Sequence, residues 1–179
     1  IEQLLASASK LYRWISGAQE LSVINESSPF SFGAQGRGNI RYRNSLDGPS
    51  LFTYNGDNQY YRSDDLGQSW FRLSSLPATP LQDGVFVSYA DPNTMILAEV
   101  EAHVSRNGGI SWNKINTWPE YYDDPITKLH ADMMHIDEYN YNSGSFIAIA
   151  NHGGINISYD KYLNNRSIAQ LHLNVSQYY

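Results

Sequence analysis

Apolar and polar residues alternate in short runs along most of the chain, and turn residues separate these runs. The stretches SLFTYN, GVFVSY and GSFIAIA are typical, with Gly, Asn, Asp or Pro close to their ends. Alternation with a period of two residues predicts β-strands, and little of the chain shows the period near 3.6 that is typical of helices. The sequence therefore predicts an all-β fold of successive antiparallel strands.

An eight-residue pattern, S-x-[D/N]-x-G-x-S-W, occurs twice at the ends of such strands. It reads SDDLGQSW at 63–70 and SRNGGISW at 105–112. A third copy begins with Ser158 and Asp160, but KYLNNRSIAQL replaces its second half. We call these segments boxes 1, 2 and 3. A pattern that recurs indicates a structural unit, and we expect structural roles for Ser63, Asp65, Gly67, Ser69, Trp70, Ser105, Asn107, Gly109, Ser111, Trp112, Ser158 and Asp160.

Each box has the composition of a tight turn between two strands. Asp65 and Asn107 can accept hydrogen bonds from backbone N–H groups within the turn. The glycines allow a positive φ, which other residues rarely adopt. Trp70 and Trp112 are expected to bury their rings between neighbouring sheets. The two acids at 64–65 are thereby explained without catalysis.

A second marker repeats with nearly the same spacing as the boxes. Asp47, Asp91 and Asp137 each lie in a loop before an apolar strand, 44 and 46 residues apart. A period in the mid-forties with about four strands per unit is typical of β-propeller blades. We therefore expect a single partial β-propeller over 1–179, with approximate units 1–36, 37–80, 81–120 and 121–179. Its open faces would be covered by the remainder of the propeller or by another protein chain.

Composition excludes several classes of function. The chain carries 12 Lys and Arg against 18 Asp and Glu, a net charge of −6. Nucleic-acid binding needs a basic face, so we expect no nucleic-acid partner. The absence of cysteine excludes disulfides, thiolate metal sites and thiol catalysis. No apolar run approaches the ~20 residues that span a bilayer, so we expect no membrane insertion.

The boxes, together with HADMMHIDEYNYNSGSFIAIANHGGINISYD, resemble the Asp-box or bacterial-neuraminidase-repeat propellers. That family includes sialidases, xyloglucan-cleaving glycoside hydrolases, sortilin-type receptors and many secreted bacterial proteins. The resemblance implies that the boxes lie at the periphery of the ring and that the protein is extracellular or at the cell surface. The start at Ile1 and the apolar end of the sequence lead us to expect a piece of a longer protein.

Chemically suggestive side chains concentrate in the segments YYDDP, HADMMH and NHGG. Strand alternation would place His130 and Asp132 on one side and His135 on the other, which argues against a shared metal site. We expect no metal and no cofactor. The favoured interpretation is that Asp132 orients His130 by a hydrogen bond and both fix a loop. Ligand binding is the alternative, with candidate residues Tyr121, Tyr122, Asp123, Asp124, His130, Asp132, His135 and His152.

Two kinds of catalytic site were considered, and neither is complete in the sequence. A sialidase needs an arginine cluster, for which GRGNIRYR offers Arg37, Arg41 and Arg43. Other glycosidases need two carboxylates across a cleft, and Asp132 or Asp137 could supply one of them. The second has no clear candidate, although Asp123 and Asp124 lie in an aromatic loop whose Trp118, Tyr121 and Tyr122 could stack on sugar rings. Catalytic residues therefore stay unknown, and enzymatic activity is left open. The hypothesis is a binding or scaffold module of a larger secreted or surface protein, with glycan as a second candidate partner. The alternative is part of a propeller glycoside hydrolase.

Overall fold

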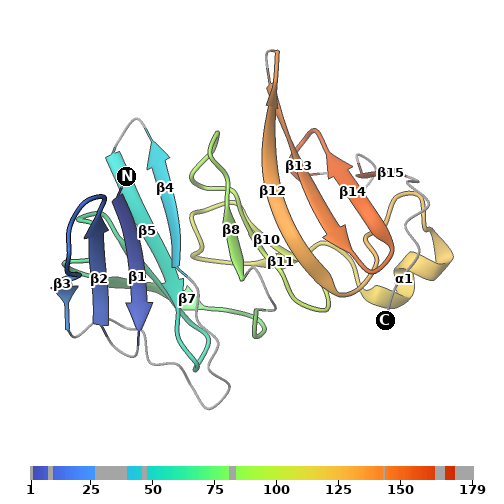
Figure 1. Cartoon of the computed structure of the whole chain (residues 1–179). Helices are drawn as coiled ribbons and strands as arrows, with labels where there is room; N and C mark the ends of the chain where they lie inside the picture. Colours follow the sequence, from blue (N-terminus) through green and yellow to red (C-terminus); the bar gives the residue numbers. More distant parts are fainter. Residues whose placement is uncertain are drawn as a thin grey trace. The chain divides into compact units, whose positions relative to one another are not determined.

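The described part of the chain forms antiparallel sheets in two compact units. The computed structural model describes residues 2–7, 10–26, 40–45, 48–80, 84–142, 144–163 and 168–171. Among these residues there are four sheets, and in each one strands that follow one another in sequence pair side by side (Figure 1). The units are Ile1–Leu76 and Pro77–Tyr179, with two sheets in each. The predicted all-β class is confirmed. Asp47 and Arg37 lie outside the described residues.

The first unit contains a three-stranded and a four-stranded sheet. Their strands are β1 (Glu2–Ser7), β2 (Lys10–Ile15) and β3 (Ser22–Asn25), then β4 (Ile40–Ser45), β5 (Gly48–Tyr54), β6 (Gln59–Ser63) and β7 (Phe71–Ser75). Leu11 of β2 and Leu51 of β5 are completely buried in one cluster, so the two sheets share a core. Trp70 packs against this cluster and is partly buried, and Trp112 in the second unit is partly buried as well, so the expected burial of the two rings is only partial.

The second unit contains two four-stranded sheets and a short helix. The strands are β8 (Val85–Val87), β9 (Met95–Leu97), β10 (His103–Ser105) and β11 (Asn113–Lys114), then β12 (Met133–Tyr141), β13 (Gly144–Asn151), β14 (Gly154–Ser158) and β15 (Ile168–Leu171). The two sheets share one apolar core, in which Phe86 and Ile96 meet Ile136, Ile147 and Ile149. Each sheet thus buries against its neighbour an apolar face that would otherwise be exposed to water.

The three boxes form the same turn. In each, the first serine accepts a backbone hydrogen bond from the residue four positions later: Gly67 N to Ser63 Oγ is 2.8 Å, Gly109 N to Ser105 Oγ 2.9 Å and Tyr162 N to Ser158 Oγ 2.9 Å. Two successive residues have positive φ in every turn, at 66–67, 108–109 and 161–162. Box 3 therefore keeps its turn, although Tyr162 stands where the others have glycine.

The third residue of boxes 1 and 2 accepts the same backbone bond with two different side chains. Ser69 N donates to Asp65 Oδ1, and Ser111 N donates to Asn107 Oδ1, both at 2.9 Å. The serine hydroxyls then take opposite roles. Ser69 Oγ donates to Asp65 Oδ2 at 2.5 Å, whereas Ser111 Oγ accepts from Asn107 Nδ2 at 2.9 Å. A rotatable hydroxyl can do either, so the turn accommodates both residues.

We expect Asp65→Asn to change the free energy of unfolding at pH 7 by less than about 1 kcal/mol, because asparagine reproduces the bonds of box 2. The hydroxyl and backbone N–H of Ser69 lower the pKa of Asp65 from 3.8 to about 2. A carboxylate with a lowered pKa stabilises the fold above its unfolded pKa and loses that contribution as pH falls through the folded value. Denaturation at pH 7, 4 and 2 should therefore show that the free energy of unfolding falls less in the variant than in the wild type. An equal fall in both proteins would contradict the hydrogen bonds assigned to the Asp65 carboxylate.

Candidate functional site

The second unit has two chemically different ends. Because the strands of a meander alternate in direction, successive turns lie at opposite ends of a sheet. Box 2 shares an end with the β8–β9 turn, since Gly108 N donates to Asn93 O at 3.1 Å. The β9–β10 turn lies at the other end with the segment 115–132, since Asp132 N donates to Val100 O at 3.0 Å. We call these the box end and the connector end, and the segment 115–132 the connector.

The box end contains a carboxylate that is almost fully enclosed. The Glu138 side chain is 1% exposed, on β12. One of its oxygens accepts hydrogen bonds from Ser88 Oγ at 2.8 Å and Tyr89 N at 2.6 Å, and the other accepts from Ser145 Oγ at 2.6 Å. Lys161 Nζ lies 3.6 Å from Glu138. Burial raises the pKa of Glu138, but these bonds and the lysine outweigh burial and lower it.

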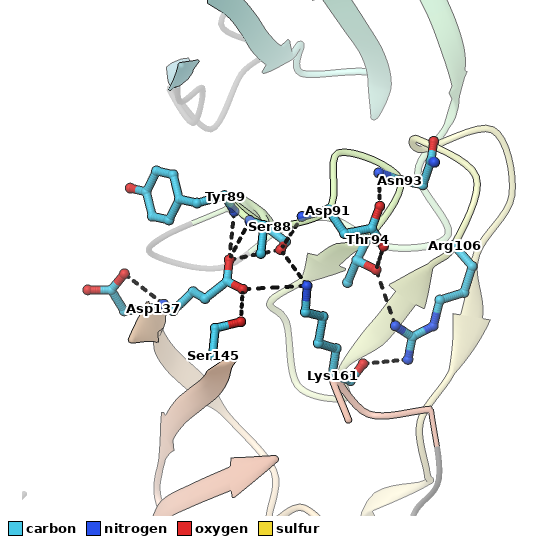
Figure 2. Close-up of polar contacts among 11 residues, drawn as sticks. Ser88, Tyr89, Asp91, Asn93, Thr94, Arg106, Asp137, Ser145 and Lys161 are labelled. Atoms are coloured by element: carbon cyan, nitrogen blue, oxygen red, sulfur yellow. Dashed lines mark hydrogen bonds and ion pairs between the residues drawn. The ribbon is translucent and has the colours of Figure 1, made fainter. Parts of the chain in front are cut away.

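The network around Glu138 continues to box 2 (Figure 2). Figure 2 shows Lys161 between Ser88 and the loop that carries Arg106. Arg106 donates to the backbone oxygen of Lys161 and to Thr94 Oγ1, and Thr94 Oγ1 donates to Asp91 Oδ2 at 2.6 Å. These contacts join both sheets of the unit and boxes 2 and 3. These contacts hold parts of the fold to one another, so we assign the network a structural role and call it the latch.

Glu138 was not among the candidate residues predicted from the sequence, although the sequence contains a signal for it. Ile136 and Glu138 are two positions apart, so alternation along β12 places them on the same face, and both are buried. A charged residue at a core position needs partners, which is the reason for the network. Asp137 was expected in a loop but lies within β12, so that expectation was wrong. Its Oδ1 accepts a hydrogen bond from the Glu138 N–H at 2.8 Å.

The connector end contains a helix where the sequence analysis expected an aromatic loop. Helix α1 (Trp118–Asp123) has an N-cap at Thr117 and a proline in its first turn. Glu120 Oε2 accepts from the Thr117 N–H at 2.6 Å and from the Thr117 hydroxyl at 2.7 Å. The sequence T-W-P-E therefore begins a short helix, because its threonine is the N-cap, its proline lies in the first turn and its glutamate bonds back to the cap. A prediction of strands and turns alone does not include this helix.

Four aromatic rings gather on and beside α1. Trp118 and Tyr122 lie 5.9 Å apart edge to face, Tyr121 and Tyr122 lie 5.6 Å apart, and the His130 ring lies 4.7 Å from Tyr121. Such geometry is the favourable one for aromatic pairs. Gly153 closes the other side of His130, because a Cβ at that position would come within 2.6 Å of the His130 Cβ. The sequence-predicted Tyr121, Tyr122 and His130 are therefore brought together.

Asp132 pairs with His152 rather than with His130. The distance from Asp132 Oδ2 to His152 Nδ1 is 3.0 Å, whereas His130 Nδ1 lies 3.1 Å from the oxygen of Ala131. The expected hydrogen bond from Asp132 to His130 was therefore wrong. Asp132 has a φ of +62°, which is not the backbone conformation of a strand. Its side chain therefore does not follow the alternation expected of a strand, and its carboxylate lies against His152 in the β13–β14 turn.

The remaining predicted residues lie outside this pair. His135 is exposed on β12, beyond an irregularity in strand pairing between Met133 and His135. Asp124 accepts bonds from the backbone and hydroxyl of Thr127, and Asp123 is exposed at the end of α1. Within the described residues, no group of three or more His, Asp or Glu is placed to hold a metal ion.

Three ionisable residues of the β9–β10 turn and β10 also belong to this end and were missed. Glu101 accepts from Trp118 N at 2.8 Å and pairs with Lys114, while His103 Nδ1 lies 3.3 Å from Glu99 Oε1. Burial raises the pKa of Glu99 and lowers that of His103, because an apolar environment disfavours the charged form of each. Their signal was the spacing E-x-E-x-H at 99–103, which repeats an ionisable group at alternate positions.

Of the arginine cluster considered for a sialidase, Arg41 and Arg43 lie on β4, opposite Phe52 and Ser50 of β5. Arg43 is buried, in the first unit. A group that binds a substrate carboxylate must be accessible, so Arg43 is a poor candidate. None of the described helices is long and apolar enough to cross a membrane.

Comparisons with known proteins place this geometry on a familiar fold. Neither a protein-family model nor a curated protein sequence matches the chain. Among solved structures, YCF48 bound to D1 peptide aligns with a TM-score of 0.50 and 20% identity over 86% of this chain and 44% of that one. The GH74 enzyme of Niastella koreensis aligns with a TM-score of 0.52 and 18% identity over 92% of this chain and 22% of that one.

Both of these proteins are β-propellers, and the present chain spans less than half the length of either. The four antiparallel sheets thus have the fold of several blades of a propeller, as the repeat period predicted. At these identities the likeness concerns the fold alone.

Proposed function

We propose that this chain is a binding or scaffold module of the Asp-box propeller class, in a larger secreted or cell-surface protein, and that its connector end contacts a partner polypeptide. The repeated turn of boxes 1, 2 and 3 supports the class. The observation that carries the function is the exposed aromatic surface of α1, with Trp118 49% and Tyr122 66% exposed. Exposed Trp and Tyr are enriched where proteins bind each other.

The carboxylates around that surface favour binding over catalysis. Glu101 pairs with Lys114, Glu120 caps α1, and Asp132 pairs with His152. Glycosidases need two carboxyl groups aimed at the same bond, about 5–10 Å apart. Carboxylates that hold a lysine, a helix start and a turn serve the structure instead. YCF48, a protein of similar fold, has been captured with a peptide, which is compatible with a peptide-binding use of such sheets.

A second surface supports the expectation that a further blade packs on the second unit. Alternation places Ile136 on the face of β12 that packs against the neighbouring sheet, and Tyr139 and Tyr141 on the opposite face. There Tyr141 and Tyr159 lie in ring contact with Phe146, and both tyrosines are largely exposed. An aromatic sheet face of this kind is suited to a second sheet, from the same protein or from another chain.

The proposed function is tested by panning a random peptide library and, separately, a glycan array against the protein. We expect peptides to be enriched, and the enrichment to be lost in the double variant Trp118→Ala/Tyr122→Ala. Tyr89→Ala is the control, because Tyr89 is exposed at the box end. Glycans that bind through Trp118 and Tyr122, without any peptide enrichment, would contradict the proposal and favour the glycoside hydrolase alternative.

The variant Asp132→Asn distinguishes the scaffold function from the glycoside hydrolase alternative. Asparagine tolerates a positive φ and keeps a hydrogen-bonding oxygen for the turn, so we expect the free energy of unfolding to fall by less than about 1 kcal/mol and peptide binding to persist. Thermal melts and the library assay measure both. If the longer protein cleaves a glycan and this variant abolishes cleavage without lowering Tm, Asp132 is catalytic and the scaffold function fails.

A further inference from the structure

The connector end combines exposed aromatic rings with an excess of negative charge. The β9–β10 turn and the connector carry six carboxylates, at Glu99, Glu101, Glu120, Asp123, Asp124 and Asp132, against one lysine, with a second on β11. Both lysines are already paired, Lys114 with Glu101 and Lys128 with Glu120 at 3.6 Å. Of the other four carboxylates, Glu99 lies 3.3 Å from His103 and Asp132 lies 3.0 Å from His152. The negative charge that remains beside α1 is therefore that of Asp123 and Asp124.

Two exposed carboxylates of α1 adjoin the rings in sequence. Glu120 caps the helix and pairs with Lys128, whereas Asp123 directly follows Tyr122. It is exposed, in contrast to Asp124, whose carboxylate accepts hydrogen bonds within the next turn. The Trp118 and Tyr122 rings meet edge to face at 90°, and both side chains are exposed, so part of their ring surface is open to a ligand. An aromatic face with a carboxylate beside it attracts cations through two additive effects.

We infer that the aromatic surface of Trp118 and Tyr122, with Asp123 at its edge, binds arginine side chains of a basic segment in a partner polypeptide. The inference rests on the proposed function and narrows it to one chemistry. Arginine fits better than lysine because its planar guanidinium stacks on an aromatic ring while its N–H groups remain directed at a carboxylate. A guanidinium is also less strongly hydrated, so its transfer to an aromatic surface costs less.

The binding is tested with two fluorescein-labelled twelve-residue peptides of glycine and serine. One carries arginine at every third position, and the other carries citrulline, the uncharged isostere, at the same places. Fluorescence anisotropy with the wild-type chain should give a Kd at least about tenfold lower for the arginine peptide, which corresponds to about 1.4 kcal/mol. Raising the salt concentration should weaken that binding.

Variants assign the effect to the named residues. Trp118→Ala/Tyr122→Ala should raise the Kd of the arginine peptide at least about tenfold, and Asp123→Asn about threefold. Asp57→Asn is the matched control, because it removes one exposed negative charge from the first unit and should leave the Kd unchanged. An equal effect of Asp57→Asn would mean that only the net charge of −6 is sensed, and would overturn the inference.

The remaining outcomes separate this inference from the proposed function. Equal binding of the arginine and citrulline peptides would overturn the cationic specificity. So would binding of neither peptide. If the random library still enriches neutral or acidic peptides through Trp118 and Tyr122, the peptide-binding function stands and only its specificity is wrong. If the library enriches nothing, the proposed function fails with it.

Discussion

Replacing Glu138 by alanine is expected to lower the free energy of unfolding by about 3–5 kcal/mol, the largest effect of any substitution considered for this chain. The variant leaves Ser88, Tyr89 N and Ser145 without the acceptor they share, and leaves Lys161 beside an empty site. Buried donors that lose their acceptor cost far more than the net value of the bonds themselves. Denaturation in urea, followed by circular dichroism, measures the change.

Two further variants show whether the charge or the shape of Glu138 matters. Glu138→Gln keeps the size and one carbonyl acceptor, so it should cost less than alanine, and it gives a measurable value if the alanine variant does not fold. Because the pKa of Glu138 is lowered, the wild type should lose stability as pH falls below the ordinary value of 4.5, and the glutamine variant should lose less. Alanine and wild-type proteins of equal stability would show that the latch is not stabilising.

Replacing Gly67 by alanine is expected to cost about 2–4 kcal/mol, for two separate physical reasons. Gly67 has a φ of +92°, which strains any residue with a Cβ. A Cβ there would also stand 2.0 Å from Leu11 Cδ2, and Leu11 is completely buried in the core of the first unit. The neighbouring sheets would have to move apart or Leu11 would have to leave its rotamer.

Gly17→Ala separates these two reasons. Gly17 has a φ of +90°, almost the same as Gly67, but nothing lies within 4 Å of the position of its added Cβ. It therefore carries the backbone strain alone, about 1 kcal/mol or somewhat more. The difference between the two variants in urea denaturation is the cost of the contact with Leu11. If both variants lose the same stability, box 1 does not pack against β2 in solution.

Much of the fold could be predicted because its signals are local. Alternating apolar runs indicate strands, and the spacing of serine, acid and glycine in boxes 1 and 2 indicates a turn whose bonds all lie within a few residues. Box 3 shows the limit of that reasoning. Tyr162 adopts the positive φ of a glycine, and its ring, 3% exposed, is held in the core of the second unit. Packing by residues distant in sequence outweighs the local backbone preference.

The sequence predicted several residues of the candidate site but not which side chains pair with one another. Tyr121, Tyr122 and His130 come together as expected of neighbouring segments. The partner of Asp132 could not be read from the sequence, because a positive φ at Asp132 redirects the side chain to His152, twenty residues away. Identifying Glu138 required knowledge of which face of β12 is buried. Two of its partners, Ser88 and Tyr89, come from the loop after β8 in the other sheet. Pairings of this kind depend on tertiary structure, to which a single sequence gives no direct access.

The separation of the two ends of the second unit has a consequence for how this protein can change over generations. The network of polar side chains around Glu138 and Lys161 lies at the box end, while the exposed rings lie at the connector end. Substitutions at Trp118, Tyr122 or Asp123 thus leave the latch untouched, and selection can alter what is recognised at little risk to folding. The same division makes α1 the natural place for laboratory evolution of new specificities on this scaffold.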